Sequence, residues 1–422
     1  MGTFLGYRCS VCGAEYSPEA VTYTCPVDGG NLDVILDYER IRDRTNLSDL
    51  MASTESSIWR YLPLLPVGDP GHLGTPLRAV GWTPLFSPPR LAEDLGLSYL
   101  WLKDDGRNPT ASFKDRASAV VVARAQAIGA EVVVTASTGN AGAALAGMAA
   151  ATGMPAVILA PRTAPQAKVA QLLIFGARVF LIDGSYDEAF DLTLEAADAF
   201  GWYCRNTGYN PFTAEGKKTA SYEICEQLTN TVRAVREPPL QWEVPDAVFV
   251  SVGDGNIISG LHKGFKDLFE LGWIERIPRL YGVQSHGSAA IYNAFVSGTE
   301  DIQPVEAKTL ADSISVDLPR DGLRAVRAAT QTGGAYIAVR DEDILGAVRE
   351  LARKAAVFAE PAGAASYAGL TKALSEGLVG PMDRVVVLNT GSGLKDVNAA
   401  MKAAGEAIVI EPKLEALEKA LR

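Results

Sequence analysis

The chain has 422 residues, of which 48% are hydrophobic and 21% are charged. At roughly 100–200 residues per domain, this length predicts two to four domains, and the composition excludes a globally disordered chain. The formal net charge of −11 argues against nucleic acid or an anionic membrane as the main partner. We therefore expect an acidic globular protein whose partner is a small molecule.

The sequence MGTFLGYRCSVCG at the start lacks a charged segment followed by an apolar one, so we do not expect it to be a secretory signal. No run approaches 18 consecutive apolar residues, so no membrane segment is expected. Five cysteines in a chain of this size do not predict a disulfide framework. Together these features indicate a cytoplasmic protein.

Residues 1–36 contain Cys9, Cys12 and Cys25, and their two Cys-rich turns predict a small hairpin module. Cys9-x-x-Cys12 is half of a zinc-ribbon pattern, but Asp28 stands where a fourth cysteine would complete it. Three thiolates and a carboxylate can hold a structural zinc ion; a ribbon that keeps its turns without metal is the alternative. From there to about residue 80 the sequence predicts an irregular arm that wraps around the rest.

From residue 98 onward, short apolar runs alternate with helical patterns. Fully apolar runs of this length indicate parallel strands buried on both faces. The predicted class is α/β with two open, doubly wound sheets. The expected strands lie at 99–103, 131–137, 155–160, 177–182, 202–206, 247–253, 279–285, 335–339 and 384–390, with helices from 139, through 171 and across 186–200.

Polar loops follow four of these strands, at the sheet edge where open α/β proteins bind ligands. In the first, Lys114 opens a helix, where partial desolvation would lower its pKa and make it a nucleophile; a solvated lysine is the alternative. The second supplies Ser137, Thr138, Asn140 and the N–H groups of a helix N-terminus. It suits a carboxylate or phosphate, or is an ordinary helix cap.

The third loop, 252–260, can turn successive N–H groups toward a single phosphate, although it lacks the P-loop and dinucleotide patterns. The fourth places the hydroxyl of Thr390 where it can meet a heterocycle nitrogen. For both, a plain βα turn is the alternative. In this order, a nucleophilic lysine, a polar cradle, a phosphate loop and a late hydroxyl indicate pyridoxal phosphate.

The chain resembles the fold-type II pyridoxal-phosphate enzymes, and within them the threonine synthase group, over roughly residues 75–400. The implied fold is that of the tryptophan synthase β-subunit type, with a Cys-rich head similar to the zinc-ribbon-like start of some threonine and cysteate synthases. We expect a head at 1–36, a large domain of 37–107 and 205–422, and a small domain at 108–204. The resemblance rests on SFKDR (112–116), ASTGNAGAA (136–144), AKVAQLLIFGARV (167–179), EGKKTASYEI (215–224), VGDGNI (252–257), AEPAGAAS (359–366) and TGSGLKD (390–396).

The resemblance also implies roles for single residues. Lys114 matches the lysine that forms a Schiff base with pyridoxal 5'-phosphate and moves protons. Asn140 matches the asparagine that hydrogen-bonds the cofactor's phenolic oxygen, and Thr390 the hydroxyl that faces its pyridine nitrogen. The cofactor set is completed by Phe113, Gly253, Asp254, Gly255, Asn256 and Ile257, and the substrate set is Ser137, Thr138, Asn140 and Lys168.

The implied reaction converts O-phospho-L-homoserine and water to L-threonine and phosphate in a homodimer. The chain departs from the group at Ala141, where threonine is frequent, and at Thr213, where an arginine is expected to grip the substrate phosphate. Lys168, Lys217 and Lys218 are candidates to replace it. A cysteate-synthase-like β-replacement on O-phosphoserine, a serine/threonine dehydratase, and a non-catalytic regulator are the alternatives.

Overall fold

The computed structural model describes residues 2–137, 139–164, 166–232 and 241–421. Its largest sheet has six strands, and all neighbouring pairs are parallel except the pair of the edge strand β4 with β5. Each strand of this sheet predicted from the sequence is present, and the two-residue β4 is an addition too short to carry a pattern. The order is β12 (Ala335–Val339), β11 (Arg279–Ser285), β10 (Ala247–Ser251), β13 (Arg384–Asn389), β5 (Tyr99–Asp104), β4 (Leu85–Phe86).

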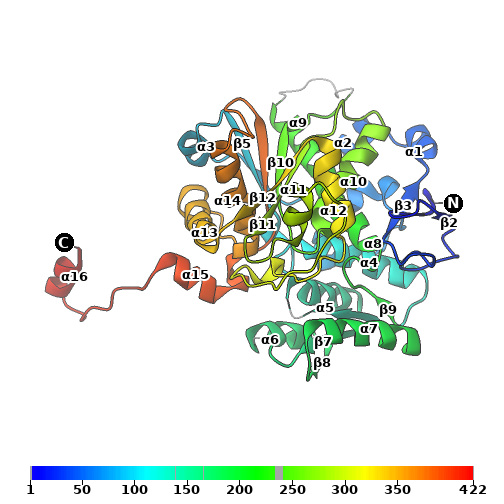
Figure 1. The fold of residues 1–422 in the computed structure, drawn as a ribbon, viewed down its shortest axis with the longest axis horizontal. Helices are drawn as coiled ribbons and strands as arrows, with labels where there is room; N and C mark the ends of the chain where they lie inside the picture. The colour runs from blue at the N-terminus through cyan, green and yellow to red at the C-terminus, as the bar shows by residue number, and fades with distance from the viewer. Residues whose placement is uncertain (1, 138, 165, 233–240, 422) are drawn as a thin grey trace.

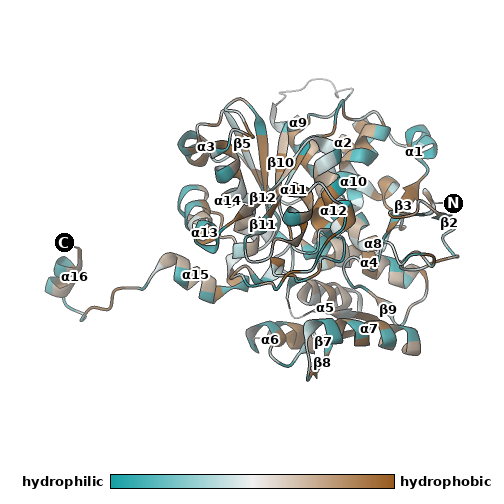
Figure 2. Cartoon of the chain, in the orientation of Figure 1, coloured by the Kyte–Doolittle hydropathy of each residue, from teal (hydrophilic) through white to brown (hydrophobic). Residues whose placement is uncertain are grey.

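Helices cover both faces of this sheet, which explains why its strands are apolar throughout. All five residues of β10 are buried. In Figure 2 hydrophobic colour follows the central strands, while the outer helices α3 and α13 are largely hydrophilic. One face carries α10 (Asn256–Glu270), α11 (Ala290–Val296) and α12 (Gly322–Thr332); the other carries α3 (Pro89–Leu95), α13 (Asp341–Ala355) and α14 (Pro361–Ser375).

A second sheet of four parallel strands lies below the first in Figure 1. The strands predicted at 131–137 and 202–206 are present but shorter. Helix α4 (Lys114–Ala127) packs against α5 beside this sheet and against α8 beside the large one, so it joins the two halves. The elements are β8 (Arg178–Ile182), β7 (Ala156–Pro161), β6 (Val133–Ala136) and β9 (Tyr203–Cys204), with α5 (Asn140–Thr152), α6 (Gln166–Ile174), α7 (Tyr186–Phe200), α8 (Phe212–Lys217) and α9 (Thr219–Val232).

The head is a small antiparallel sheet of β2 (Glu15–Tyr16), β1 (Phe4–Cys9) and β3 (Leu32–Leu36). It is fastened to α12, because Arg324 forms a 2.7 Å ion pair with Asp33 and Arg327 donates to the carbonyl of Ser10. The side-chain amide of Asn31 donates to two backbone carbonyls of the body, those of Gly208 and Arg320. The head therefore contacts the loop around Gly208, which follows the carboxyl end of the strand Tyr203–Cys204.

Residues 37–80 differ from the predicted irregular arm. They form α1 (Tyr38–Arg44), α2 (Leu47–Ala52) and the 3₁₀ turns η1 (Ile58–Leu64) and η2 (Pro76–Ala79). These segments are too short to show a clear hydrophobic period, which is why the sequence did not reveal them. Further 3₁₀ turns are η3 (Asp105–Arg107), η4 (Asp312–Ile314) and η5 (Gly393–Lys395).

Helix α15 (Val397–Ala404) packs against α13, and α16 (Leu414–Leu421) extends away from the body at the C-terminal end (Figure 1). No residue of α16 is buried. Within the described ranges, no helix is both long and apolar enough to cross a membrane.

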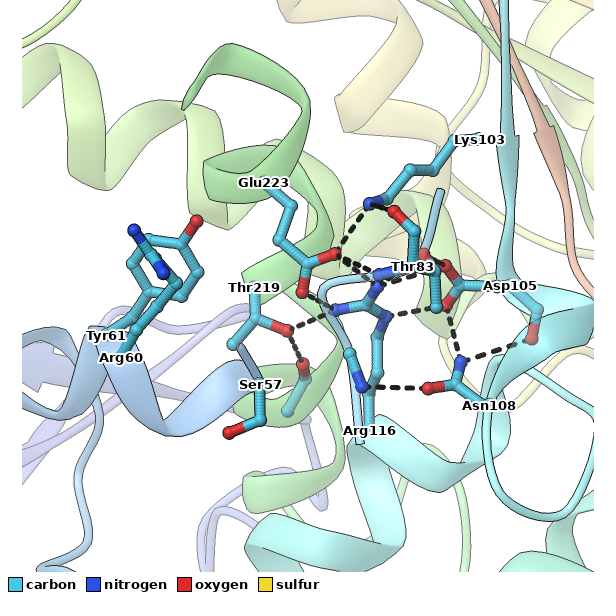
Figure 3. A network of polar contacts seen from close by, with 12 residues as sticks. Ser57, Arg60, Tyr61, Thr83, Lys103, Asp105, Asn108, Arg116, Thr219 and Glu223 are labelled. Carbon is cyan, nitrogen blue, oxygen red and sulfur yellow. Dashed lines mark hydrogen bonds and ion pairs between the residues drawn. The ribbon is translucent and has the colours of Figure 1, made fainter. Parts of the chain in front are cut away.

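A buried charged network fixes the start of α4 (Figure 3). Arg116 lies 2.6 Å from the carboxylate of Asp105 and 2.5 Å from that of Glu223, and Lys103 lies 2.6 Å from Glu223. All four side chains are fully buried. Through Arg116, which lies two residues after Lys114, the network connects α4 to β5 and α9. It therefore fixes the position of Lys114.

Candidate cofactor and substrate site

Lys114 is brought to the end of β13 by backbone hydrogen bonds. The N–H of Phe113 donates to the carbonyl of Thr390 at 2.9 Å, and Ser112 forms an isolated bridge with Gly391. Lys114 is half-buried, and desolvation, followed by the charge of Arg205, lowers its pKa. A lower pKa favours the neutral amine, as the sequence analysis expected of a nucleophile.

The predicted phosphate loop connects β10 to α10. Gly255 has a left-handed backbone with φ of 94°, and a Cβ atom there would meet the carbonyl oxygen of Asp321 at 2.6 Å. Asn256 accepts a 2.5 Å hydrogen bond from the ammonium of Lys217. Burial, then the charges of Lys114 and Arg205, lower the pKa of Lys217 well below its ordinary value. A bound anion would relieve this repulsion.

A narrow cavity of about 50 Å³ joins these groups. Lys114 lies on one wall, and Thr390, Glu360 and the loop from Gly253 to Ile257 form the others, with Lys217 beside the loop. An amine, a glycine loop that leaves room for close backbone approach, and a buried cation fit the aldehyde and phosphate ends of pyridoxal phosphate. Of the sequence-predicted cofactor residues, Lys114, Thr390 and the loop from Gly253 to Ile257 line this cavity, whereas Phe113 and Asn140 do not.

Asn140, the first residue of α5, donates a 2.7 Å hydrogen bond to the carboxylate of Glu360. Burial raises the pKa of Glu360 to about 7, although the charge of Lys114 opposes this. The sequence analysis gave Glu360 no role. Its position directly before Pro361 at the start of α14 repeats the polar-residue-before-helix pattern of the other loops, and that signal could have identified it.

Two larger cavities adjoin the narrow one. The first, of about 330 Å³, is lined by Asn140, Glu360 and Lys168, whose ammonium contacts the carboxylate of Asp312. The second, of about 380 Å³, is lined by polar residues from both halves of the chain. They include Lys114, Ser137, Asn140, Arg205, Thr207, Asp254 and Arg320, and the apolar Ala141 lies among them.

The predicted substrate residues occupy these two cavities in part. Ser137 lines the second cavity, and its hydroxyl accepts a 3.2 Å hydrogen bond from the N–H of Gly139. Thr138 lies outside the described residues. Asn140 lines both cavities.

Thr213 and Lys218 do not face these cavities. The hydroxyl of Thr213 is fully buried and donates to the carbonyl of Asn210 at 2.7 Å. Lys218 pairs with Glu215 at 2.5 Å and with Asp267 at 2.9 Å. The interpretation of Lys218 as a replacement for the missing arginine is therefore wrong, because its charge is already neutralised inside the core.

The cysteines of the head converge as well. Ligand atoms of Cys9, Cys12, Cys25 and Asp28 all lie within 4.8 Å of one another. The sulfur atoms of Cys12 and Cys25 are 3.8 Å apart, and the sulfur of Cys9 lies 3.3 Å from the Asp28 carboxylate.

Comparison with known proteins identifies the family of the chain. Residues 77–391 match the family described as "Pyridoxal-phosphate dependent enzyme". The chain is 39% identical over 417 residues to the threonine synthase of Methanocaldococcus jannaschii, covering 98% of this chain and 99% of that protein. It is 36% identical to the threonine synthase of Mycobacterium tuberculosis over 81% of this chain and 89% of that one. The chain therefore belongs to the pyridoxal-phosphate dependent enzymes, and among them to the threonine synthase family.

Solved structures share the fold at lower identity. The processed form of threonine deaminase isoform 2 from Solanum lycopersicum has a TM-score of 0.64 and 22% identity, covering 82% of this chain and 92% of that one. Maize serine racemase has a TM-score of 0.61 and 21% identity, covering 80% and 91%. These likenesses confirm the predicted fold-type II architecture.

Proposed function

We propose that the chain is a threonine synthase that converts O-phospho-L-homoserine and water to L-threonine and inorganic phosphate. The observation that carries the proposal is the convergence of Lys114, whose pKa is lowered, with a glycine phosphate loop and Lys217 around one cavity. The near full-length identity to curated threonine synthases supports the choice among reactions of this cofactor.

Pyridoxal 5'-phosphate, held by the residues around Lys114, would supply an electron sink for carbanion chemistry. The amine of Lys114 would remove protons from the substrate Cα and then Cβ, since its lowered pKa favours the neutral form. Ser137, Asn140 and the N-terminus of α5 would bind the substrate carboxylate. Thr390, a neutral hydroxyl, would not force protonation of a nearby ring nitrogen, which favours elimination and replacement over transamination.

Product analysis with three substrates tests this proposal. The holoenzyme should release phosphate and form threonine from O-phosphohomoserine. Cysteate from O-phosphoserine with sulfite would instead indicate the β-replacement, and a keto acid with ammonia from serine or threonine would indicate a dehydratase. No turnover of any of them would favour the non-catalytic regulator.

The domain division, the oligomeric state and the location are also proposals. All strands of the four-stranded sheet lie within 133–204, which supports a small domain at 108–204 inserted between 37–107 and 205–422, with the head at 1–36. Resemblance to the family supports a cytoplasmic homodimer. Sedimentation equilibrium of the holoenzyme checks the dimer.

We further propose that the head binds one structural zinc ion through Cys9, Cys12, Cys25 and Asp28. The 3.8 Å separation of two sulfur atoms is the value that tetrahedral zinc with Zn–S bonds of about 2.3 Å requires. Elemental analysis after chelator-free purification should find about one zinc per chain, and less in Asp28→Ala. Cys225→Ser, in the core of the body, is the matched control and should retain the metal. Zinc far below one equivalent in the wild type would contradict the proposal, and full occupancy in Asp28→Ala would exclude Asp28 as a ligand.

Replacing Lys217 by glutamine should weaken cofactor binding by about 10–100-fold, because it removes a charge-assisted hydrogen bond from the phosphate end of the site. Titration of the apoenzyme with pyridoxal phosphate, followed by visible absorbance, measures the change. An unaltered dissociation constant would show that Lys217 does not contact the cofactor phosphate.

A further inference from the structure

Arg205 is a buried cation near the site with one unpartnered nitrogen. It follows β9, and its side chain is fully buried. Its Nη1 donates to the hydroxyl of Thr207 at 2.6 Å and its Nε to that of Ser118 at 3.3 Å, whereas Nη2 has no hydrogen-bond partner. Among the described residues no carboxylate lies within ion-pair distance of it. Burial lowers its pKa to about 10.

A buried guanidinium without a counterion is unfavourable unless something else compensates for its lost hydration. Arg205 and Thr207 line the cavity of about 380 Å³ that also contains Lys114. Thr207 lines the narrow cofactor cavity too, so the pair lies where the two cavities meet. The unpartnered donor is therefore beside the place where a substrate held near Lys114 would be.

The charges around Arg205 favour the binding of an anion. The charge of Arg205 lowers the pKa of both Lys114 and Lys217, and Asp254 is the carboxylate that opposes it most strongly at Lys217. One phosphate at the glycine loop would neutralise Lys217. Asp254 and Asp115 raise the pKa of Arg205 without forming an ion pair with it among the described residues, so its unpartnered nitrogen is available to a second anion.

The other cations of these cavities already have partners. Lys168 contacts Asp312, Arg320 forms a 2.6 Å ion pair with Asp187, and Lys395 donates to the side-chain oxygen of Gln171 at 3.0 Å. The hydroxyl of Thr213, where the threonine synthase group is expected to carry arginine, is bonded within the core. Arg205 is left as a planar donor of the kind that binds phosphate with two parallel hydrogen bonds.

We propose that Arg205, with Thr207 beside it, binds the phosphate of the substrate and so selects phosphorylated over free hydroxy amino acids. In this proposal Arg205 binds the substrate phosphate in place of the arginine expected at position 213. This inference rests on the proposed threonine synthase function, which it deepens by naming the residue that recognises the leaving group.

Two variants of the holoenzyme test it, Arg205→Met and Arg205→Lys. Arg205→Met should weaken binding of inorganic phosphate, measured by calorimetry, by about 10²-fold, and should raise KM for O-phosphohomoserine by a similar factor. Arg205→Lys keeps the charge but loses the two parallel hydrogen bonds of the guanidinium. It should recover part of the phosphate affinity and reverse part of the rise in KM. Cofactor absorbance should be unchanged, and the melting temperature unchanged or higher, because an unpaired buried charge has been removed.

Arg320→Gln is the matched control, since it removes another arginine of the same cavity that already has a carboxylate partner. It should change phosphate binding by less than about threefold. The inference is overturned if Arg205→Met binds phosphate as the wild type does, if it loses the cofactor, or if Arg320→Gln shows the larger loss. A wild type that binds phosphate through Arg205 but turns over no phosphohomoserine would overturn the proposed function alone.

Discussion

Replacing Lys114 by alanine should abolish the visible absorbance of the bound cofactor and lower turnover by at least about 10⁴-fold, while the chain still folds. The rate loss combines a proton-transfer role, which alone contributes about 10²–10⁴-fold, with loss of covalent attachment. Folding should survive because, among the described residues, Lys114 forms no ion pair whose partner would be left buried.

Absorbance before and after borohydride treatment measures the first effect, and mass spectrometry of the reduced wild type locates the modified peptide. The cofactor should be found on the peptide that contains Lys114 and not on the one that contains Lys217. An unchanged spectrum in Lys114→Ala would contradict the assignment of this lysine.

Replacing Glu223 by alanine should destabilise the protein by about 3–5 kcal/mol, because it leaves Arg116 and Lys103 buried without their shared carboxylate. Urea unfolding measures the free energy. Glu15→Ala removes the partner of Arg8 from an ion pair whose side chains are more than half exposed, and is the matched control. That change should cost less than about 1 kcal/mol. Equal losses in the two variants would show that the network in Figure 3 contributes no more than a surface pair.

The same network predicts a pH dependence. Burial alone would raise the pKa of Glu223, but Arg116 and Lys103 outweigh it and lower that pKa to about 2. The native state therefore binds the proton less readily than the unfolded chain, whose glutamate titrates near 4.5. The stabilisation is complete above that value and is lost as the pH falls toward 2. Unfolding free energies of Glu223→Gln should decline less steeply across this range than those of the wild type.

The elements recovered from the sequence are those whose pattern is local and long enough to be distinctive. The apolar runs at 279–285 and 335–339 became β11 and β12 with unchanged bounds, because strands buried on both faces must be apolar at every position. The edge strand β4 and the short helices of residues 37–80 carry too few residues for a period. These elements are stabilised by packing against the body, and such tertiary contacts cannot be predicted from the sequence of one segment.

Site residues that directly follow a strand could be predicted from the sequence. Site residues whose role depends on which side chains they contact after folding could not. Lys114 and the loop from Gly253 follow apolar runs, so parallel-sheet geometry alone brings them to one edge. Nothing in the sequence around Arg205 indicates that one of its nitrogens lacks a partner after folding. Lys218 was misjudged for the converse reason, since Asp267, which neutralises it, lies far along the chain.

Asn31 connects the head to the loop that carries Thr207. It follows Gly30, whose N–H donates to Asp28 at 2.8 Å, and its side chain holds the carbonyls of Gly208 and Arg320. A metal ion bound at the turn of Asp28 and a phosphate bound at the loop of Thr207 would therefore both act on the hydrogen bonds that Asn31 forms. If metal binding in the head changes the affinity for phosphate by some factor, thermodynamic linkage requires that phosphate binding change the affinity for metal by the same factor.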